Sequence, residues 1–468
     1  MKEAIFVNIR EFKAFFWSFV DGVGSQGSQL IITIMLARLL TPADFGVIGL
    51  ISVVVYLSNV IGNGGLNNSL IRKAKVSADD FTSVFVFNIT VGILLYAIIF
   101  FSSGFLAHFL KLPEAEVYLK VYALSIIFTS FEQIQRVTLT LDLNFRTQAK
   151  ITLFSVIFSG VIALILAHSG FGVWALIIQT VVLSSVRCVI FWCVIRWKPT
   201  GHFKWPLLLE HLNFGYKLLL GNFVDVAYRY MFNLGIGKFY SVTDLGFYNQ
   251  ATKLTEVPSM TITSVVRRVN YPIISKLRHN NKCYFGNLIN IASYIISVYL
   301  PVSLWLSFNS HDIILKLLGE RWVGASLFLS ILSLAFFVVP LSNLFGNILS
   351  VEGRTDLYLK IRLSVKLILG IMFVLIHSYG IHVVLYFIIF ATVFEWFVNI
   401  VISHKYFKFP VLKYIKRMVL IMVPIIISSV LINYSININS IVGDLAVKLI
   451  LSMIVPAGIL FLLSKEKV

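Results

Sequence analysis

The sequence predicts an all-α polytopic membrane protein with about 14 transmembrane helices, arranged as two parallel six-helix repeats followed by two further helices. Three observations support this fold class. Of the 468 residues, 58% are hydrophobic and only 13% are charged, which lies outside the range of soluble domains. Apolar runs of roughly 20 residues, long enough to cross a membrane, recur along the whole chain. A short pattern near residue 40 also returns near residue 240.

The apolar runs define the expected helices. We expect membrane spans at residues 14–38, 46–70, 81–107, 118–140, 150–168, 172–195, 212–238, 247–270, 284–308, 323–349, 358–378, 382–403, 413–433 and 445–464. The N-terminal stretch MKEAIFVNIREFK is amphipathic, and the apolar segment after it has no small-residue cleavage pattern. We therefore expect no cleaved signal peptide.

The positions of Lys and Arg give the orientation, because these residues gather on the cytoplasmic side of membrane proteins. With the N-terminus in the cytoplasm, all of the basic clusters lie inside, namely those at 72–75, 196–198, 267–268, 276–282 and 413–417. We therefore expect both termini to be cytoplasmic. The net charge of +18 then reflects this topology and contact with anionic membrane lipids, and we expect no nucleic acid partner.

A repeated turn divides the chain. ARLLTPADFG (37–46) joins the first two expected spans, and GKFYSVTDLG (237–246) joins the seventh and eighth. The matching positions are Arg38 with Lys238, Asp44 with Asp244, and Gly46 with Gly246. Six spans separate the copies, and an even number makes the repeats parallel. We expect a six-helix bundle at 1–205, a second at 206–408 and two additional helices at 409–468, a duplication typical of transporters.

The sequence offers no convincing enzyme motif. GVGSQG (22–27) matches the dinucleotide-binding pattern G-x-G-x-x-G, but it lies inside one span-length apolar run and not between a strand and an amphipathic helix. Cys188 and Cys193 stand about 140° apart around a helix, so they cannot hold a metal together. We therefore predict no enzyme activity, no cofactor and no metal site.

Four stretches resemble a known family: ARLLTPADFGV (37–47), DLGFYNQA (244–251), NYPIISKL (270–277) and LLGERWVGA (317–325). With them the chain resembles, over nearly its whole length, the Wzx-type polysaccharide repeat-unit flippases of the MOP exporter superfamily, in the branch of colanic acid and teichuronic acid exporters. The resemblance implies the MOP flippase fold and a place in the bacterial inner (cytoplasmic) membrane. It implies an undecaprenyl-diphosphate-linked oligosaccharide as substrate, moved to the outer leaflet through a V-shaped, alternating-access cavity between the halves. It also implies a role in O-antigen, capsule or exopolysaccharide synthesis, beside a polysaccharide polymerase and a chain-length regulator.

Ionisable residues inside spans are the candidate site, because a charge in the membrane faces protein or water. Asp225 and Arg229 stand four residues apart in the seventh span, and Lys253 and Glu256 three apart in the eighth, so each pair shares a helix face. We predict that these four residues and Arg187 bind the substrate. Arg229 and Lys253 would contact the diphosphate, since cations, and a guanidinium fork above all, suit phosphate oxygens. Alternatively, each pair only neutralises itself and holds helices together.

Two acids have no charged neighbour in the sequence. Asp21 and Glu395 therefore suit a coupling site for a cation or a proton, although a pair across two helices fits them equally well. Three further cations lie near cytoplasmic span ends, where snorkelling to the interface explains them: Arg136, Arg267 and Lys366. Recognition of sugar hydroxyls would fall to amides, for which the unranked candidates are Asn59, Asn63, Asn67, Asn88, Gln133, Gln250 and Asn343.

Three other functions fit parts of the sequence. A drug or metabolite antiporter of the MATE kind belongs to the same superfamily, but it typically has twelve spans and a less basic interior. A membrane polysaccharide polymerase or ligase would use the same lipid-linked sugars, but its chemistry needs a long external loop, and the external segments here are short. A scaffold without transport leaves so many charges inside the membrane unexplained.

Overall fold

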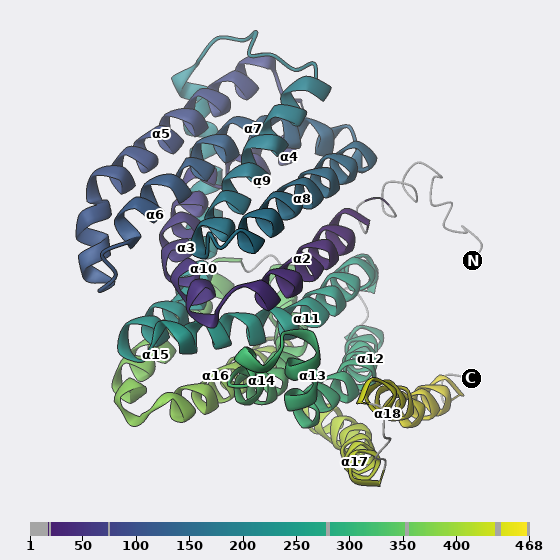
Figure 1. The fold of residues 1–468 in the computed structure, drawn as a ribbon. Coiled ribbons are helices and arrows are strands. Elements are labelled where there is room, and N and C mark those ends of the chain that lie inside the picture. The colour runs from purple at the N-terminus through teal and green to yellow at the C-terminus, as the bar shows by residue number, and fades with distance from the viewer. Residues whose placement is uncertain are drawn as a thin grey trace. The chain divides into compact units, whose positions relative to one another are not determined.

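The computed structural model describes residues 17, 20–73, 75–277, 281–351, 355–435 and 441–465, and all regular structure in these residues is helical (Figure 1). The helices form two compact units, residues 1–246 and 247–468. Eight helices of the described part are long and apolar enough to cross a membrane. The predicted all-α multi-pass fold is confirmed, and the expected spans fall on helical segments wherever they are described. The start of the first expected span, residues 14–16, 18 and 19, lies outside the described residues. The number of fourteen crossings stays a prediction, and part of the basic cluster at 276–282 lies outside the described residues.

The described residues of unit 1 form one π-helical turn, nine α-helices and the first turn of a tenth, α11 (Val242–Leu277). The complete elements are η1 (Val20–Gly24), α2 (Ser25–Leu39), α3 (Pro42–Asn63), α4 (Leu66–Arg72), α5 (Ala78–Phe109), α6 (Ala115–Tyr122), α7 (Leu124–Leu141), α8 (Phe145–His168), α9 (Val173–Val194) and α10 (Trp205–Phe239). Helices α5, α7, α9, α8 and α2 each pack against the next in that order (Figure 1). The span containing α3 and α4 is the most enclosed in unit 1, with 56% of its apolar window buried.

Helix starts follow from capping residues. Thr41 accepts a hydrogen bond from the backbone N–H of Asp44, and the Asp44 carboxylate accepts one from the Thr41 backbone N–H at 2.8 Å. Pro42 occupies the first helical turn, where its missing N–H has no consequence. Ser77 and Asp80 cap α5 in the same reciprocal way. These exchanges satisfy N–H groups that the first turn of a helix leaves without partners.

The two copies of the repeated turn interlock. In the second copy, the Ser241 hydroxyl accepts a hydrogen bond from the backbone N–H of Asp244 at 2.9 Å, so the capping chemistry is repeated as well. A Cβ on Gly46 would lie 1.8 Å from the carbonyl oxygen of Val242. A Cβ on Gly246 would lie 1.9 Å from the carbonyl oxygen of Pro42. Each turn therefore presents its glycine to the backbone of the other, in a contact that only glycine permits.

Helix α10 packs antiparallel along α3. Its last turns lie beside the start of α3, where a Cβ on Gly237 would meet the side chain of Leu50 at 2.6 Å. Its first turns lie beside the start of α4, where Gly65 and Gly215 bring two backbones into contact. Between them, the rings of Tyr56 and Tyr230 stack. The first helix of the predicted second bundle thus belongs to the first compact unit, and a repeat boundary after residue 205 stays a prediction.

A buried hydrogen-bond network also fastens α10 to unit 1. His211 on α10 is 1% exposed, and its ring nitrogens lie 2.7 Å from the Ser69 hydroxyl and 3.0 Å from the Asp80 carboxylate. Asp80 also accepts a hydrogen bond from Lys73 at 2.9 Å. Lys73 follows α4, and this bond is the main cause that raises its pKa above the ordinary value. A buried carboxylate needs such partners, so the network holds α4, α5 and α10 together.

Unit 2 consists of most of α11 (Val242–Leu277) and the elements that follow it. These are α12 (Asn281–Phe308), α13 (Ser310–Leu317), η2 (Glu320–Trp322), α14 (Ala325–Val351), α15 (Thr355–Ile376), η3 (His377–Tyr379), α16 (Ile381–Phe407), α17 (Val411–Ser435) and α18 (Ile441–Lys465). Helices α12 and α14 form its centre, with 67% of each apolar window buried. The aromatic rings of Phe345, Phe409 and Tyr414 pack edge to face in its core.

Candidate functional site

An ion pair joins α7 and α9 inside unit 1. Arg187 Nη2 lies 2.6 Å from Glu132 Oε1, and Arg187 Nε donates to Glu132 Oε2 at 2.8 Å. The Glu132 side chain is only 3% exposed, and that of Arg187 is 20% exposed. This bidentate geometry satisfies a carboxylate that would otherwise be buried without a counter-charge. Arg187 was predicted to bind substrate, but in the structure its guanidinium is paired with Glu132.

A second arginine stands beside this pair. Arg136 lies on α7 one turn after Glu132, and its side chain is exposed. Within the described part of the chain, its guanidinium makes no hydrogen bond and no ion pair. Arg136 is therefore a cation that a ligand could reach near the C-terminal end of α7. From its place near a span end, the sequence analysis expected this side chain to snorkel to the membrane interface.

Asp21 lies in the π-helical turn η1, which runs directly into α2. Its Oδ2 accepts a hydrogen bond of 3.0 Å from Nε2 of Gln148 on α8. Asp21 Oδ1 and Gln148 Oε1 are both buried and have no hydrogen-bond partner among the described residues. Two unsatisfied acceptor oxygens on adjacent side chains are suited to a proton or a small cation. The glycines of GVGSQG lie in these same helical turns, not in a loop between a strand and a helix.

Asp225 and Arg229 lie one turn apart in the middle of α10, within unit 1. The Arg229 side chain is exposed and that of Asp225 is half-buried. The next residue, Tyr230, stacks on Tyr56 of α3 with ring centroids 5.1 Å apart and planes inclined by 13°. If α10 crosses the membrane as the sequence predicts, an exposed guanidinium beside an aromatic stack favours contact with a polar ligand.

The remaining predicted residues lie in unit 2. Lys253 is exposed and Glu256 half-buried, three residues apart on α11. Glu395 lines a polar cavity of about 20 Å³ between α14, α15 and α16, together with Asn343, Arg362 and Asn399. This volume suits a single water molecule or ion. The guanidinium of Arg362 in the same lining offers Glu395 a partner on another helix. Such a cross-helix pair was the alternative to a coupling site for Glu395.

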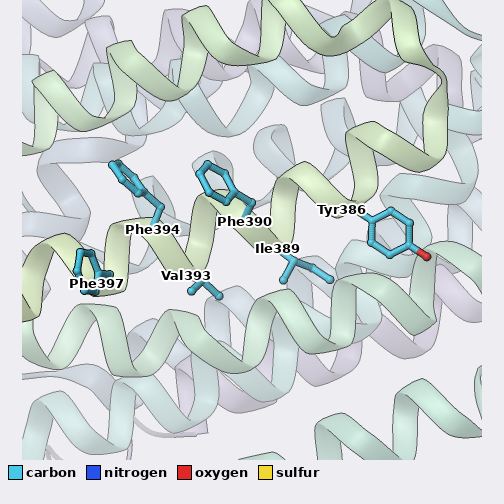
Figure 2. Close-up of a pocket in the computed structure, with 6 residues that line it drawn as sticks. All are labelled: Tyr386, Ile389, Phe390, Val393, Phe394 and Phe397. Carbon is cyan, nitrogen blue, oxygen red and sulfur yellow. The ribbon is translucent and has the colours of Figure 1, made fainter. Parts of the chain in front are cut away.

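A larger hollow in unit 2 is of another kind. Figure 2 shows the side chains that line it along α16, namely Tyr386, Ile389, Phe390, Val393, Phe394 and Phe397. Its volume is about 470 Å³, and none of these side chains is charged. An apolar surface hollow on a candidate membrane span suits lipid chains.

The structure thus separates the predicted site into two groups. Asp21, Arg187, Asp225 and Arg229 belong to unit 1, and Lys253, Glu256 and Glu395 to unit 2. A joint contact of Arg229 and Lys253 with one diphosphate stays a prediction. Sequence reasoning missed the partners Glu132 for Arg187 and Gln148 for Asp21, since each pair spans more than fifty residues. Sequence reasoning also missed the stack of Tyr56 on Tyr230. The polar residues Asn59 and Asn63, three and seven positions after Tyr56, were a signal that this face of the helix is polar.

Comparison with known proteins gives consistent matches. A family described as "Polysaccharide biosynthesis protein" matches residues 35–327. The teichuronic acid biosynthesis protein TuaB of Bacillus subtilis is 24% identical over 343 residues, which cover 73% of this chain and 71% of TuaB. The succinoglycan biosynthesis transport protein ExoT of Rhizobium meliloti is 26% identical, with 68% of this chain and 65% of ExoT covered.

Solved structures match the fold. The lipid II flippase MurJ in an inward closed conformation aligns with a TM-score of 0.77 at 15% identity, covering 97% of this chain and 99% of MurJ. An inward-facing multidrug resistance MATE transporter of the MOP superfamily aligns with a TM-score of 0.63 at 14% identity, covering 85% of this chain and 95% of that one. At these identities the likeness is one of fold.

Proposed function

Because the chain belongs to this polysaccharide biosynthesis protein family, we propose that it is a flippase for undecaprenyl-diphosphate-linked oligosaccharides. It would carry repeat units for O-antigen, capsule or exopolysaccharide synthesis from the cytoplasmic to the outer leaflet of the bacterial inner membrane. Its relatives TuaB and ExoT are named for teichuronic acid biosynthesis and succinoglycan transport, which are both polysaccharide processes. A polysaccharide polymerase and a chain-length regulator would act on what it delivers.

The observation that carries the proposal is the exposed Arg229 within α10. A guanidinium in a membrane helix is retained where it meets an anion, and a diphosphate offers several oxygens to its planar fork. Asp225, one turn earlier, would orient the fork, and Lys253 of unit 2 would add a second cation when the halves close on the substrate. Alternating access then requires only that the two units rock about this group.

The proposal is tested with the purified protein in liposomes. We expect it to move an undecaprenyl-diphosphate-linked oligosaccharide, extracted from the protein's own host, from the inner to the outer leaflet. An impermeant lectin added outside reports the translocated sugar, and protein-free liposomes are the control. Transfer no faster than in protein-free liposomes would contradict a flippase.

A MATE-like antiporter is the second candidate, because a MATE transporter shares the fold over 85% of this chain. The MurJ alignment leaves only about 3% of the chain unmatched, less than either α17 or α18, so it extends through the two helices that a twelve-helix antiporter lacks. This extent supports the flippase. The same liposomes distinguish the two, since an antiporter would exchange ethidium for a cation and leave the glycolipid in place.

Membrane topology is the first specific prediction. We expect the turns that carry the repeat to be external, so that cysteines in place of Ala43 and Thr243 react with an impermeant maleimide in intact cells. These positions spare the capping residues, and the background replaces Cys188, Cys193 and Cys283 with serine. A cysteine in place of Lys75 should react only after the cells are opened. The reverse pattern of labelling would overturn the orientation.

Asp21 gives a second prediction. Asp21→Asn removes the charge but keeps the size of the side chain, so we expect export to slow several-fold while lipid-linked substrate remains bound to the purified protein. The reason is that Asp21 Oδ1 is an unsatisfied buried acceptor, which suits a coupling proton or cation. Export at the wild-type rate would reduce the residue to a role in helix packing with Gln148.

A further inference from the structure

We propose that one face of α3 binds the sugar residues next to the diphosphate, through the ring of Tyr56 and the amides of Asn59 and Asn63. This inference rests on the proposed flippase function and names the part of the substrate that unit 1 recognises. Asn59 and Asn63 follow Tyr56 by three and seven residues, so the three side chains share one face of the helix.

These two amides are available for a ligand. Both are partly exposed, and in the part of the chain that the structure describes their side chains make no hydrogen bond. The other amide candidates of unit 1 are engaged with one another, since Asn67 and Asn88 both donate to Gln133 Oε1, at 3.4 and 3.0 Å. Each free amide can donate to one hydroxyl and accept from another, which is what a sugar presents.

The face cannot be explained as a lipid contact. Most of the exposed residues of α5, a candidate membrane span, are apolar, among them Ile93, Leu94, Ile98, Phe101 and Phe105. On α3, by contrast, the face that bears Tyr56 presents two asparagines within the candidate membrane span Pro42–Arg72. Polar side chains inside a membrane face protein or water. Since these two make no hydrogen bond to the described part of the protein, we infer that they face water or a polar ligand.

The position of Tyr56 links this face to the predicted diphosphate contact. Its ring is 45% exposed and stacks on Tyr230, the neighbour of Arg229 on α10. Pyranose rings carry an apolar face of C–H groups that packs on aromatic rings. A ligand whose diphosphate met Arg229 would therefore place its first sugar at the tyrosine stack.

The length of the face sets how much sugar it holds. From Tyr56 to Asn63 the helix rises by roughly 10 Å, which matches about two linked hexoses. Helix α10 runs antiparallel to α3 and brings the exposed Asn222 to about the level of Asn63, where it provides a further amide. Sugars beyond these two would lie outside this face of α3, so their identity can vary.

Two binding probes test the inference on the full-length protein in detergent: undecaprenyl diphosphate, and the same lipid carrying a single N-acetylglucosamine, glucose or galactose. We expect at least one sugar to tighten binding about tenfold, as two or more net hydrogen bonds would. The double variant Asn59→Ala with Asn63→Ala should remove most of this gain. Tyr56→Leu should also reduce it, whereas Tyr56→Phe should retain it, because only the ring is needed for stacking.

The controls separate this inference from the proposed function. Asn68→Ala removes an exposed amide outside the face and should leave the gain unchanged, while binding of the sugar-free lipid shows that each variant is folded. If the sugar-free lipid binds but no sugar improves its affinity, or if the gain survives the double variant, the inference is wrong and the flippase proposal stands. If neither lipid binds, the proposed function fails together with it.

Discussion

Replacing Gly46 with valine is expected to abolish export. A Cβ at this position would lie 1.8 Å from the carbonyl oxygen of Val242, and a backbone atom cannot rotate away as a flexible side chain does. The two repeated turns would have to separate, losing the close backbone approach that small residues permit in membrane proteins. Gly46→Ala should already destabilise the protein by about 1–3 kcal/mol, as other overpacked contacts do. Gly246→Ala, which faces the carbonyl of Pro42, should behave alike.

Gly62 provides the matched control on the same helix. A Cβ there meets its nearest neighbour, Leu95 Cδ1, at 3.7 Å, which is an ordinary contact. Gly62→Ala should therefore retain both export and the unfolding temperature measured in detergent, whereas Gly46→Ala should lower that temperature by several degrees. Equal effects of the two substitutions would show that the interlocked turns have no special importance.

Arg229→Ala is expected to reduce polysaccharide export to background while the protein is still inserted at normal levels. Arg229→Lys should reduce export appreciably, because an ammonium keeps the charge but loses the fork that grips two phosphate oxygens. Surface polysaccharide is the readout, with membrane levels measured by immunoblot. Arg196→Ala, which removes an exposed arginine in the segment after α9, is the matched control and should export normally.

A double variant decides whether Arg229 binds substrate or only balances Asp225. If the pair is structural, Asp225→Asn combined with Arg229→Gln leaves neither charge without its partner and should restore much of the export that either single variant loses. Under the substrate-binding proposal, the double variant remains inactive. Export close to the wild-type level would therefore rule out a phosphate contact by Arg229.

The fold followed from the sequence because hydrophobic runs of span length leave a membrane protein few alternatives. The repeated turn at 37–46 and 237–246 also had a structural cause, which is the reciprocal approach of Gly46 and Gly246 to the opposite backbone. What the repeat could not reveal is that α10 packs on unit 1. Hydrophobic periodicity reports that a helix is buried, but not which neighbour covers it.

The candidate site was predictable in its residue types and not in its pairings. Arg187 and Asp21 were identified as charges inside the membrane, yet Glu132 and Gln148 lie on other helices at sequence distances that carry no signal. The amides show the same limit. Seven were equivalent by composition, and only the contacts with Gln133 distinguish the engaged Asn67 and Asn88 from Asn59 and Asn63.

The attachment of α10 to unit 1 also affects how the chain is synthesised. When the ribosome reaches residue 205, the helix that covers α3 and α4 has not yet been made, and some 34 residues, or about 2 to 7 s of translation, must follow. During this interval the Asp80 carboxylate lacks its contact with His211. The nascent protein then exposes to the insertion machinery a polar surface that is hidden once synthesis is complete. The first unit can finish folding only after α10 has been made.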